Sequence, residues 1–370
     1  MNLICEQCET VYPFNPTRAR CDCGGPCRVA GAPAFDPQRV EREELSLWRY
    51  QHAFPLPGGS GRVTLGAGMT PLVAAEWAGR PLLLKCEYLN PTGSFKDRGT
   101  AVLVTALAAA GVERVVEDSS GNAGSSLAAY AARAGIWASV YVPAHASPVK
   151  QAQIAAYGAG LVRVPGPRTE AARAVLAAAD AGAVYASHVY HPLVHHGIKT
   201  IAFELYEQWR RAGLDDGGPA AIFLPLGHGS LLLGLVQGLA ELQAADCIGR
   251  MPRIYGAQAS ACAPLASAWQ QGSSQPVPVE EGETIAEGVR IAAPVRGRAV
   301  LAAVRRCGGA ILAVAEARTR AAQRRLAHMG FYVEPTSAVA VAALDEMRDR
   351  LAGTAVVILT GSGFKSPASG

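Results

Sequence analysis

The sequence predicts an α/β protein with mainly parallel sheets, preceded by a small cysteine-bearing module. Short apolar runs that read as strands alternate with stretches of about ten to fifteen residues that read as helices, and this alternation favours right-handed crossovers between parallel strands. The 370 residues, 50% of them hydrophobic, also exceed one average domain. We therefore expect more than one packed core.

The N-terminal module, residues 1–30, is predicted from its cysteines. Five of the nine cysteines form a C-x2-C pair, then, after twelve residues, a C-x-C pair and one more cysteine. In a reducing compartment, such clustering indicates a tetrahedral zinc site before it indicates disulfides. We expect Cys5, Cys8, Cys21 and Cys23 to bind zinc, with Cys27 able to substitute. The alternative is a ribbon that folds without metal.

Glycines and prolines bound the elements of the first half of the remaining chain. Residues 100–111 and 121–135 read as helices that end at Gly111 and Gly135. The apolar runs before, between and after these two helices are too short to be helices themselves, and turn residues flank them. The predicted strands are 81–89, 112–120, 137–143 and 160–166.

The second half repeats the alternation. A strand at 220–227 ends in glycine and leads into a leucine-rich helix at 230–245. Further short apolar runs predict strands at 252–259, 309–315 and 354–361. The sequence contains no internal repeat.

Composition excludes several classes of function. The net charge is +4, and lysine and arginine are scattered rather than gathered in a basic run with aromatics, so a nucleic-acid partner is not expected. No apolar run reaches the ~18 residues that a membrane span needs, and the N-terminus lacks a signal-peptide pattern. We expect a cytoplasmic protein with a small-molecule substrate.

Four strand-to-helix turns are rich in Gly, Ser, Thr and Asn: 92–97, 118–126, 226–234 and 359–365. In parallel sheets, ligands bind beyond the carboxyl ends of the strands, where such turns lie. One of these turns carries Lys96, which is either a reactive amine or an ordinary cation at a helix start. The four turns together favour the reactive amine.

Each of the other three turns suits a different polar group. The backbone N–H groups of residues 227–231 suit a phosphate, although a glycine turn can also serve packing alone. The spacing of its glycines does not fit a dinucleotide fingerprint. The turn at 118–126 suits a carboxylate, with Asn122 able to donate to a phenolate-like oxygen, or is simply a helix cap. Thr360 at a strand end could bond a pyridine nitrogen, or reflect strand propensity.

Taken together, the motifs resemble threonine synthase and its relatives among the fold type II enzymes that use pyridoxal 5′-phosphate. The resemblance runs in order from about residue 46 to 366. It rests on "LGAGMTPL", "NPTGSFKDRG", "SSGNAGSSLAAYAARAG", "GIKTIAFEL", "YGAQASACAPL", "ETIAEGVRI", "EPTSAVAVAAL" and "LTGSGFK". It implies two doubly wound domains like those of the tryptophan synthase β subunit, a large one at 31–99 and 196–370 and a small one at 100–195. It also implies a homodimer.

The resemblance implies a role for each matching residue. Lys96 would hold the cofactor as a Schiff base and then move protons as the catalytic base. Asn122 would contact the ring oxygen of the cofactor, and Thr360 its pyridine nitrogen. The phosphate would lie on Gly227, His228, Gly229, Ser230 and Leu231. The substrate carboxylate would lie on Ser119, Ser120, Gly121 and Ala123.

Other positions depart from the pattern of threonine synthases. Threonine synthases act on O-phosphohomoserine, and in their sequences an arginine that would bind its phosphate aligns with Val194 of this chain. The Asn and Ser hydrogen-bond donors near that arginine align with His188, Val189 and His191. Glu287 resembles the acidic residue before glycine in serine and threonine dehydratases, and either contacts the substrate or is a solvated charge. These departures predict an intact cofactor site and a changed substrate.

The predicted function is a lyase that removes the α-proton of an amino acid and then eliminates or replaces a β- or γ-substituent. One alternative is a serine/threonine dehydratase-like or β-replacement enzyme with a non-phosphorylated substrate. Another, from a different class, is a non-catalytic regulatory protein that retains the cofactor. The presence of Lys96, Asn122 and Thr360 together favours catalysis.

Overall fold

The computed structural model describes residues 1–144, 148–166, 168–213 and 218–366. Its contacts divide the chain into two units, residues 1–68 with 90–198 and residues 69–89 with 199–370. In this division, residues 31–68, 90–99 and 196–198 group with the first unit. Residues 90–99 include the turn before the helix at Lys96–Ala109 and its first residues.

The first unit begins with a three-stranded antiparallel sheet in the order β2-β1-β3. Its strands are β1 (Asn2–Cys5), β2 (Val11–Pro13) and β3 (Cys27–Ala30). Leu3 and Cys27 are fully buried in its small core. Two 3-10 helices, η1 (Pro37–Arg39) and η2 (Leu47–Ala53), follow.

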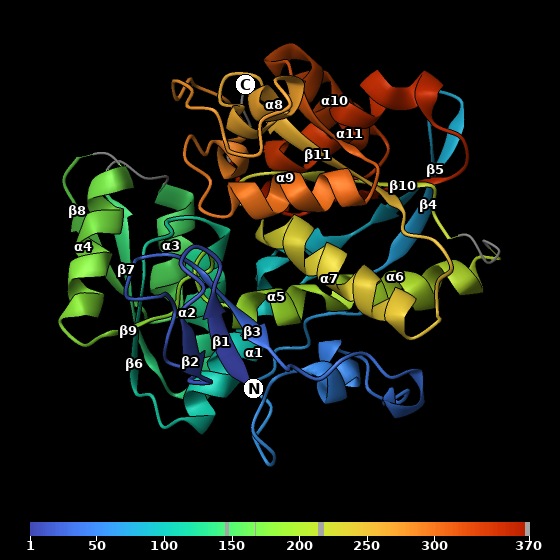
Figure 1. The fold of residues 1–370 in the computed structure, drawn as a ribbon. Helices are drawn as coiled ribbons and strands as arrows, with labels where there is room; N and C mark the ends of the chain where they lie inside the picture. The colour runs from blue at the N-terminus through green and yellow to red at the C-terminus, as the bar shows by residue number, and fades with distance from the viewer. Residues whose placement is uncertain (145–147, 167, 214–217, 367–370) are drawn as a thin grey trace. The chain divides into compact units, whose positions relative to one another are not determined.

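A parallel four-stranded sheet forms the centre of the first unit, in the order β8-β7-β6-β9 (Figure 1). The strands are β6 (Arg114–Glu117), β7 (Trp137–Pro143), β8 (Gly160–Val164) and β9 (Val184–Tyr185). The helices are α1 (Lys96–Ala109), α2 (Asn122–Ala134), α3 (Pro148–Ala156), α4 (Arg168–Asp180) and α5 (Leu193–Ile198).

Both faces of this sheet are covered by helices. On one face, Val140 and Val142 pack with residues of α2 and α3. On the other, Tyr141 packs with Val175 of α4, in a cluster that also holds Ala19 of the N-terminal module. Side chains alternate along a strand, so these neighbours in sequence serve opposite layers. The two-layer covering confirms an α/β arrangement around a parallel sheet.

The second unit contains a six-stranded mixed sheet in the order β12-β11-β10-β13-β5-β4. Only β4 is antiparallel, and it joins β5 through Ala78 and Gly79, which both have positive φ (51° and 78°) as a two-residue hairpin turn requires. The strands are β4 (Leu72–Trp77), β5 (Arg80–Lys85), β10 (Ala221–Pro225), β11 (Arg253–Ala259), β12 (Ala310–Val314) and β13 (Ala355–Ile358).

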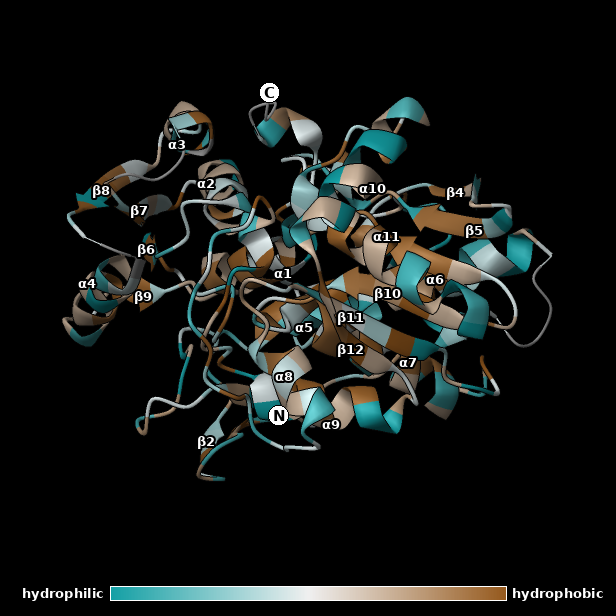
Figure 2. Ribbon diagram, turned by 90° about the horizontal axis from the view of Figure 1, so that it is seen from above, coloured by the Kyte–Doolittle hydropathy of each residue, from teal (hydrophilic) through white to brown (hydrophobic). Residues whose placement is uncertain are grey.

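Helices bury this sheet as well, and Figure 2 shows its strands β10, β11 and β12 coloured as hydrophobic. One face packs against α11 and α10. The helices are α6 (Thr200–Arg211), α7 (Ser230–Ala244), α8 (Pro264–Gln270), α9 (Gly297–Arg306), α10 (Glu316–His328) and α11 (Pro335–Met347). Short 3-10 helices are η3 (Glu87–Leu89), η4 (Glu287–Val289), η5 (Arg348–Arg350) and η6 (Gly363–Lys365).

The predicted strand at 81–89 is shorter in the structure. It ends at Lys85, whose buried ammonium donates to Glu204 Oε2 at 2.8 Å, and residues 87–89 turn into η3. Among the residues described, no helix is long and apolar enough to cross a membrane.

Candidate active site and cysteine cluster

Lys96 is the first residue of α1, and the residue after it holds the preceding turn in place. The carboxylate of Asp97 accepts hydrogen bonds from Thr92 N at 2.7 Å, Thr92 Oγ1 at 2.6 Å and Ser126 Oγ at 2.6 Å. Asp97 is completely buried, so it is not an ordinary solvated first-turn charge. Lys96 is half-buried, with Nζ 4.8 Å from the centre of the Phe95 ring. The turn that leads into Lys96 is therefore held by Asp97, which bonds Thr92 and Ser126 of α2.

The predicted carboxylate turn, residues Ser119–Ala123, leads into α2 and includes the first two residues of that helix. A Cβ on Gly124 would lie 1.9 Å from Ser119 O, so only glycine permits this approach. Within the described chain, no side chain caps α2, whose N-cap is Gly121. The helix start therefore keeps N–H groups and a positive dipole end that favour an anion. This disfavours the view that the Ser–Gly–Asn sequence is merely a cap.

Glu117 and His188 form a buried pair next to this turn, and sequence reasoning missed it as a pair. His188 Nδ1 lies 2.8 Å from Glu117 Oε1, and the His188 backbone N–H donates to Glu117 Oε2 at 3.1 Å. The side chains are 1% exposed for Glu117 and 12% for His188. Burial raises the pKa of Glu117 to about 7, against the lowering effect of hydrogen bonds and of the Lys96 charge. An apolar strand that ends in two acidic residues was the available signal.

Val194 does not lie in an open pocket. It is 4% exposed on α5, and a Cβ on Gly99 would come within 2.7 Å of its Cγ1. This close contact between α5 and α1 leaves no room for an arginine side chain at this position without displacing α1. His191 is also buried, and its Nε2 lies 2.9 Å from Pro16 O of the N-terminal module.

In the second unit, the glycine loop (residues 227–231) joins β10 to α7. Gly229 has φ +98°, and a Cβ there would lie 2.2 Å from Val300 Cγ2. A Cβ on Gly227 would lie 2.8 Å from Gly288 O, which brings the Glu287–Gly288 pair beside this loop. No described side chain caps α7, so the N–H groups at its start suit an anion. The glycines thus keep side chains out of a backbone anion site.

Thr360 follows β13 and belongs to a buried polar cluster. Its Oγ1 lies 3.1 Å from Ser337 Oγ and 3.5 Å from Glu334 Oε1, and its N–H donates to Ser337 Oγ at 2.9 Å. Glu334 and Ser337 come from the start of α11 and were not predicted as site residues. Their hydrogen bonds orient the Thr360 hydroxyl. Glu287, in contrast, has an exposed side chain.

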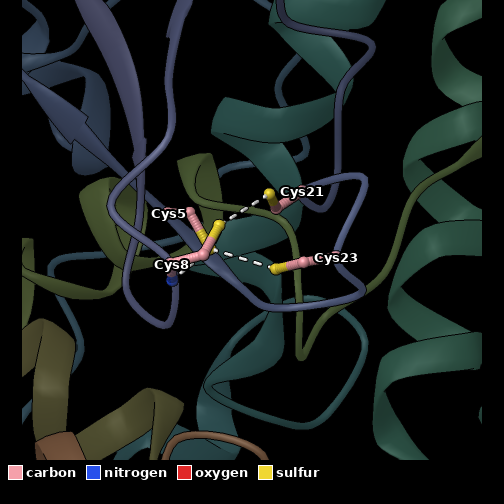
Figure 3. A group of neighbouring side chains, drawn as sticks. All are labelled: Cys5, Cys8, Cys21 and Cys23. Atoms are coloured by element: carbon pink, nitrogen blue, oxygen red, sulfur yellow. Dashed lines mark hydrogen bonds between the residues drawn. The ribbon is translucent and has the colours of Figure 1, made fainter.

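The N-terminal cysteines Cys5, Cys8, Cys21 and Cys23 converge as Figure 3 shows, with all four sulfur atoms within 4.8 Å of one another. Cys8 Sγ lies 3.5 Å from Cys21 Sγ, and Cys5 Sγ lies 3.6 Å from Cys23 Sγ. Hydrogen bonding to Thr10 lowers the pKa of Cys8 to about 6, whereas, against a lowering hydrogen bond from Gly25, hydrogen bonds with Cys8 and Cys21 raise the pKa of Cys23 to about 12. The thiolate form that metals bind is therefore favoured at Cys8 and disfavoured at Cys23. This donor set suits zinc.

Comparisons with known proteins place the chain among cofactor-dependent enzymes. Residues 63–361 match the family described as "Pyridoxal-phosphate dependent enzyme". The threonine synthase of Methanocaldococcus jannaschii is 32% identical over 98% of this chain and 92% of its own length. That of Mycobacterium leprae is 35% identical over 86% of this chain and 88% of its own. A threonine deaminase from T.th. superposes with a TM-score of 0.69 at 30% identity, covering 79% of this chain and 92% of that one.

The residues present fit pyridoxal 5′-phosphate. At the glycine loop, no described side chain caps the start of α7, and a Cβ on Gly229 or Gly227 would meet Val300 or Gly288. In the first unit, Ser94 Oγ and Ser125 Oγ are fully buried, and no described residue forms a hydrogen bond with either. A buried hydroxyl near Lys96 or at the start of α2 calls for a polar ligand. The family match and the similarity to threonine synthases show that this chain belongs to the pyridoxal-phosphate-dependent enzymes and is a lyase of the threonine synthase-like group.

Proposed function

We propose that this lyase forms threonine or a close analogue by replacing a substituent on the side chain of an amino acid. The observation that carries the proposal is the position of Lys96, on a turn fixed by Asp97 inside the region matched by the threonine synthases. A reactive amine needs such a fixed start, because proton transfer depends on its placement to within a fraction of an ångström.

The predicted cofactor and carboxylate residues have the following roles in this proposal. When bound, the cofactor withdraws electrons and makes the α-proton of the amino acid acidic. Lys96 holds the cofactor and removes and returns the α-proton. The carboxylate turn binds the substrate carboxylate at the start of α2. The glycine loop binds the cofactor phosphate, Asn122 contacts its ring oxygen, and Thr360, oriented by Ser337, faces its ring nitrogen.

The substrate is proposed from the resemblance to threonine synthases, which implies O-phosphohomoserine. The dehydratase-like alternative is not favoured by the comparisons. The test is direct: the purified holoenzyme is given O-phosphohomoserine, serine or threonine, and the products are followed. Threonine from O-phosphohomoserine supports the proposal. Exclusive formation of an oxo acid and ammonia from serine or threonine contradicts it, and no reaction with any amino acid favours the regulatory alternative.

We further propose a zinc-ribbon module at residues 1–30, with Cys5, Cys8, Cys21 and Cys23 as ligands. A homodimer is also proposed from the family resemblance, and a cytoplasmic location is proposed because a reducing compartment keeps clustered cysteines available for metal. Metal analysis of wild type against Cys5→Ser/Cys8→Ser tests the module. Equal metal content in both proteins excludes the zinc site.

A further inference from the structure

The Glu117–His188 pair lies where side chains of a substrate are expected. Glu117 is the last residue of β6, and His188 follows β9, the strand paired with β6 through Val116 and Tyr185. Both residues therefore stand at the carboxyl edge of one parallel sheet, which is the ligand-binding edge in this kind of fold. The carboxylate turn begins only two residues after Glu117.

The pair has the geometry of an oriented acid–base group. The carboxylate binds both the ring and the backbone N–H of His188, so the ring cannot turn without losing its partner. Because Nδ1 faces Glu117, any proton that the ring exchanges with another group is carried by Nε2. A carboxylate behind an imidazole is the arrangement that orients the ring and stabilises its charged form.

The charges around Glu117 come from several elements. Lys96 on α1 acts on it as a positive charge, His188 contacts it from the segment after β9, and Asp118 donates its backbone N–H to Oε1 at 3.2 Å. Tyr185 on β9 donates its hydroxyl to Asp118 Oδ1 at 2.8 Å. Glu117 and His188 together carry no net charge when they share one proton. Such a pair supplies a site that can accept or release one proton.

We propose that His188, oriented by Glu117, is the acid–base group for the side-chain oxygen of the substrate. This inference rests on the proposed function and assigns it a second proton-transfer group besides Lys96. The two have different tasks. Lys96 handles the proton on the α-carbon, and His188 handles the proton of the water that adds to the β-carbon.

The atoms balance in this step. A lone pair of the water oxygen forms the bond to the β-carbon, and one proton of that water moves to Nε2 of His188. The double bond between the α- and β-carbons is the one that remains after the γ-substituent has left and the γ-carbon has taken a proton. Its electron pair shifts to the α-carbon, which takes back from Lys96 the proton removed at the start. His188 then releases its proton to solvent, so the step needs no oxidant or reductant. In reverse, His188 protonates the hydroxyl of threonine as its bond to carbon breaks.

The experiment separates the two proton transfers by using threonine itself as the probe. The holoenzyme is incubated with threonine in deuterium oxide, and deuterium at the α-carbon is measured by NMR. A parallel sample in oxygen-labelled water measures cleavage of the carbon–oxygen bond, counted as labelled threonine hydroxyl plus oxo acid. Wild type is expected to show both.

His188→Asn is expected to lower carbon–oxygen cleavage by about 100-fold or more, the usual contribution of an acid–base group, while α-deuteration stays within a few-fold of wild type. Added imidazole is expected to restore part of the cleavage in His188→Ala. Glu117→Gln should lower cleavage less and shift its pH dependence. His328→Asn and Glu113→Gln, both exposed, are the matched controls and should behave as wild type.

Two outcomes overturn the inference while leaving the proposed function intact: unchanged cleavage in His188→Asn, or an equal fall in cleavage and α-deuteration without imidazole rescue, which indicates a purely structural role. The visible absorbance of the bound cofactor shows whether each variant is folded. His188→Gln is a second variant to measure if His188→Asn loses that absorbance. If wild type deuterates no amino acid at all, the proposed function fails, and this inference fails with it.

Discussion

Asp97 and Ser126 are joined by a hydrogen bond of 2.6 Å that ties the start of α1 to α2. Through the same carboxylate, Asp97 also holds the turn that ends at Lys96. The proposed reactive amine and the proposed carboxylate turn therefore belong to one hydrogen-bonded assembly within the first unit.

Asp97→Asn tests this assembly. The amide keeps the size of the side chain but replaces one acceptor oxygen with a donor and removes the charge. We expect the free energy of unfolding to fall by about 2–4 kcal/mol, the cost of weakening charge-assisted hydrogen bonds in a buried site. Denaturant unfolding measures this loss. Asp349→Asn, at an exposed carboxylate, should change stability by less than about 0.5 kcal/mol, and an equal loss in both variants would refute the claim.

Lys96→Ala and Lys96→Arg test the reactive amine. Arginine retains the positive charge beside Glu117 but cannot form the covalent bond to the cofactor. Both variants should lose the visible absorbance of lysine-bound cofactor and the α-proton exchange. If Lys96→Arg keeps either property, the charge of Lys96 matters and its nucleophilic amine does not.

Gly229→Ala tests the glycine loop. Alanine must adopt φ +98° and place a Cβ 2.2 Å from Val300 Cγ2, so the loop has to move. We expect cofactor affinity to fall at least tenfold in equilibrium titrations. Gly272→Ala is the matched control, because Gly272 also has positive φ (+67°) but nothing lies within 4 Å of its Cβ. Gly272→Ala should lower the free energy of unfolding by roughly 1–2 kcal/mol and leave cofactor affinity unchanged. Equal cofactor loss in both variants would argue against a role in binding.

Removal of the proposed zinc should weaken binding of the amino-acid substrate more than binding of the cofactor. The segment between the cysteine pairs contacts the rest of the first unit through Pro16, which binds His191, and through Arg20, which pairs with Asp180 at 2.9 Å. Chelation, or Cys8→Ser/Cys21→Ser, should loosen this segment and raise KM severalfold while cofactor absorbance persists. Cys247→Ser lies outside the cluster and serves as control. An unchanged KM after verified metal loss would disprove this coupling.

The pH dependence of stability reports on Glu117. Its pKa is raised from 4.5 to about 7, so the unfolded chain releases this proton at lower pH than the folded chain does. Stability is therefore greatest below about pH 4.5 as far as this group is concerned, and falls as pH rises towards 7. The fall should not exceed roughly 3 kcal/mol, and Glu117→Gln should remove it. Unfolding at several pH values measures the difference, and parallel curves for the two proteins would contradict the assignment.

Much of the fold was predictable from sequence because it depends on local patterns. The strands at 137–143 and 252–259 and the helices ending at Gly111 and Gly135 are set by apolar runs and by glycine, and the structure has them. The edge strands β4 and β9 were not predicted. β4 mixes exposed and partly buried residues, and β9 has two residues, so neither produces a clear apolar run.

The sequence by itself determined the cofactor class, through Lys96, the glycine loop and the order of the motifs, because these requirements are local and tolerate little variation. It also placed four cysteines close enough along the chain to converge. Only the tertiary structure decided that Asp97 is a buried anchor, that Val194 is packed against Gly99, and that Glu117 meets His188. Each of these depends on contacts between residues distant in the chain, and a side chain alone does not reveal which neighbour will bury it or share its proton.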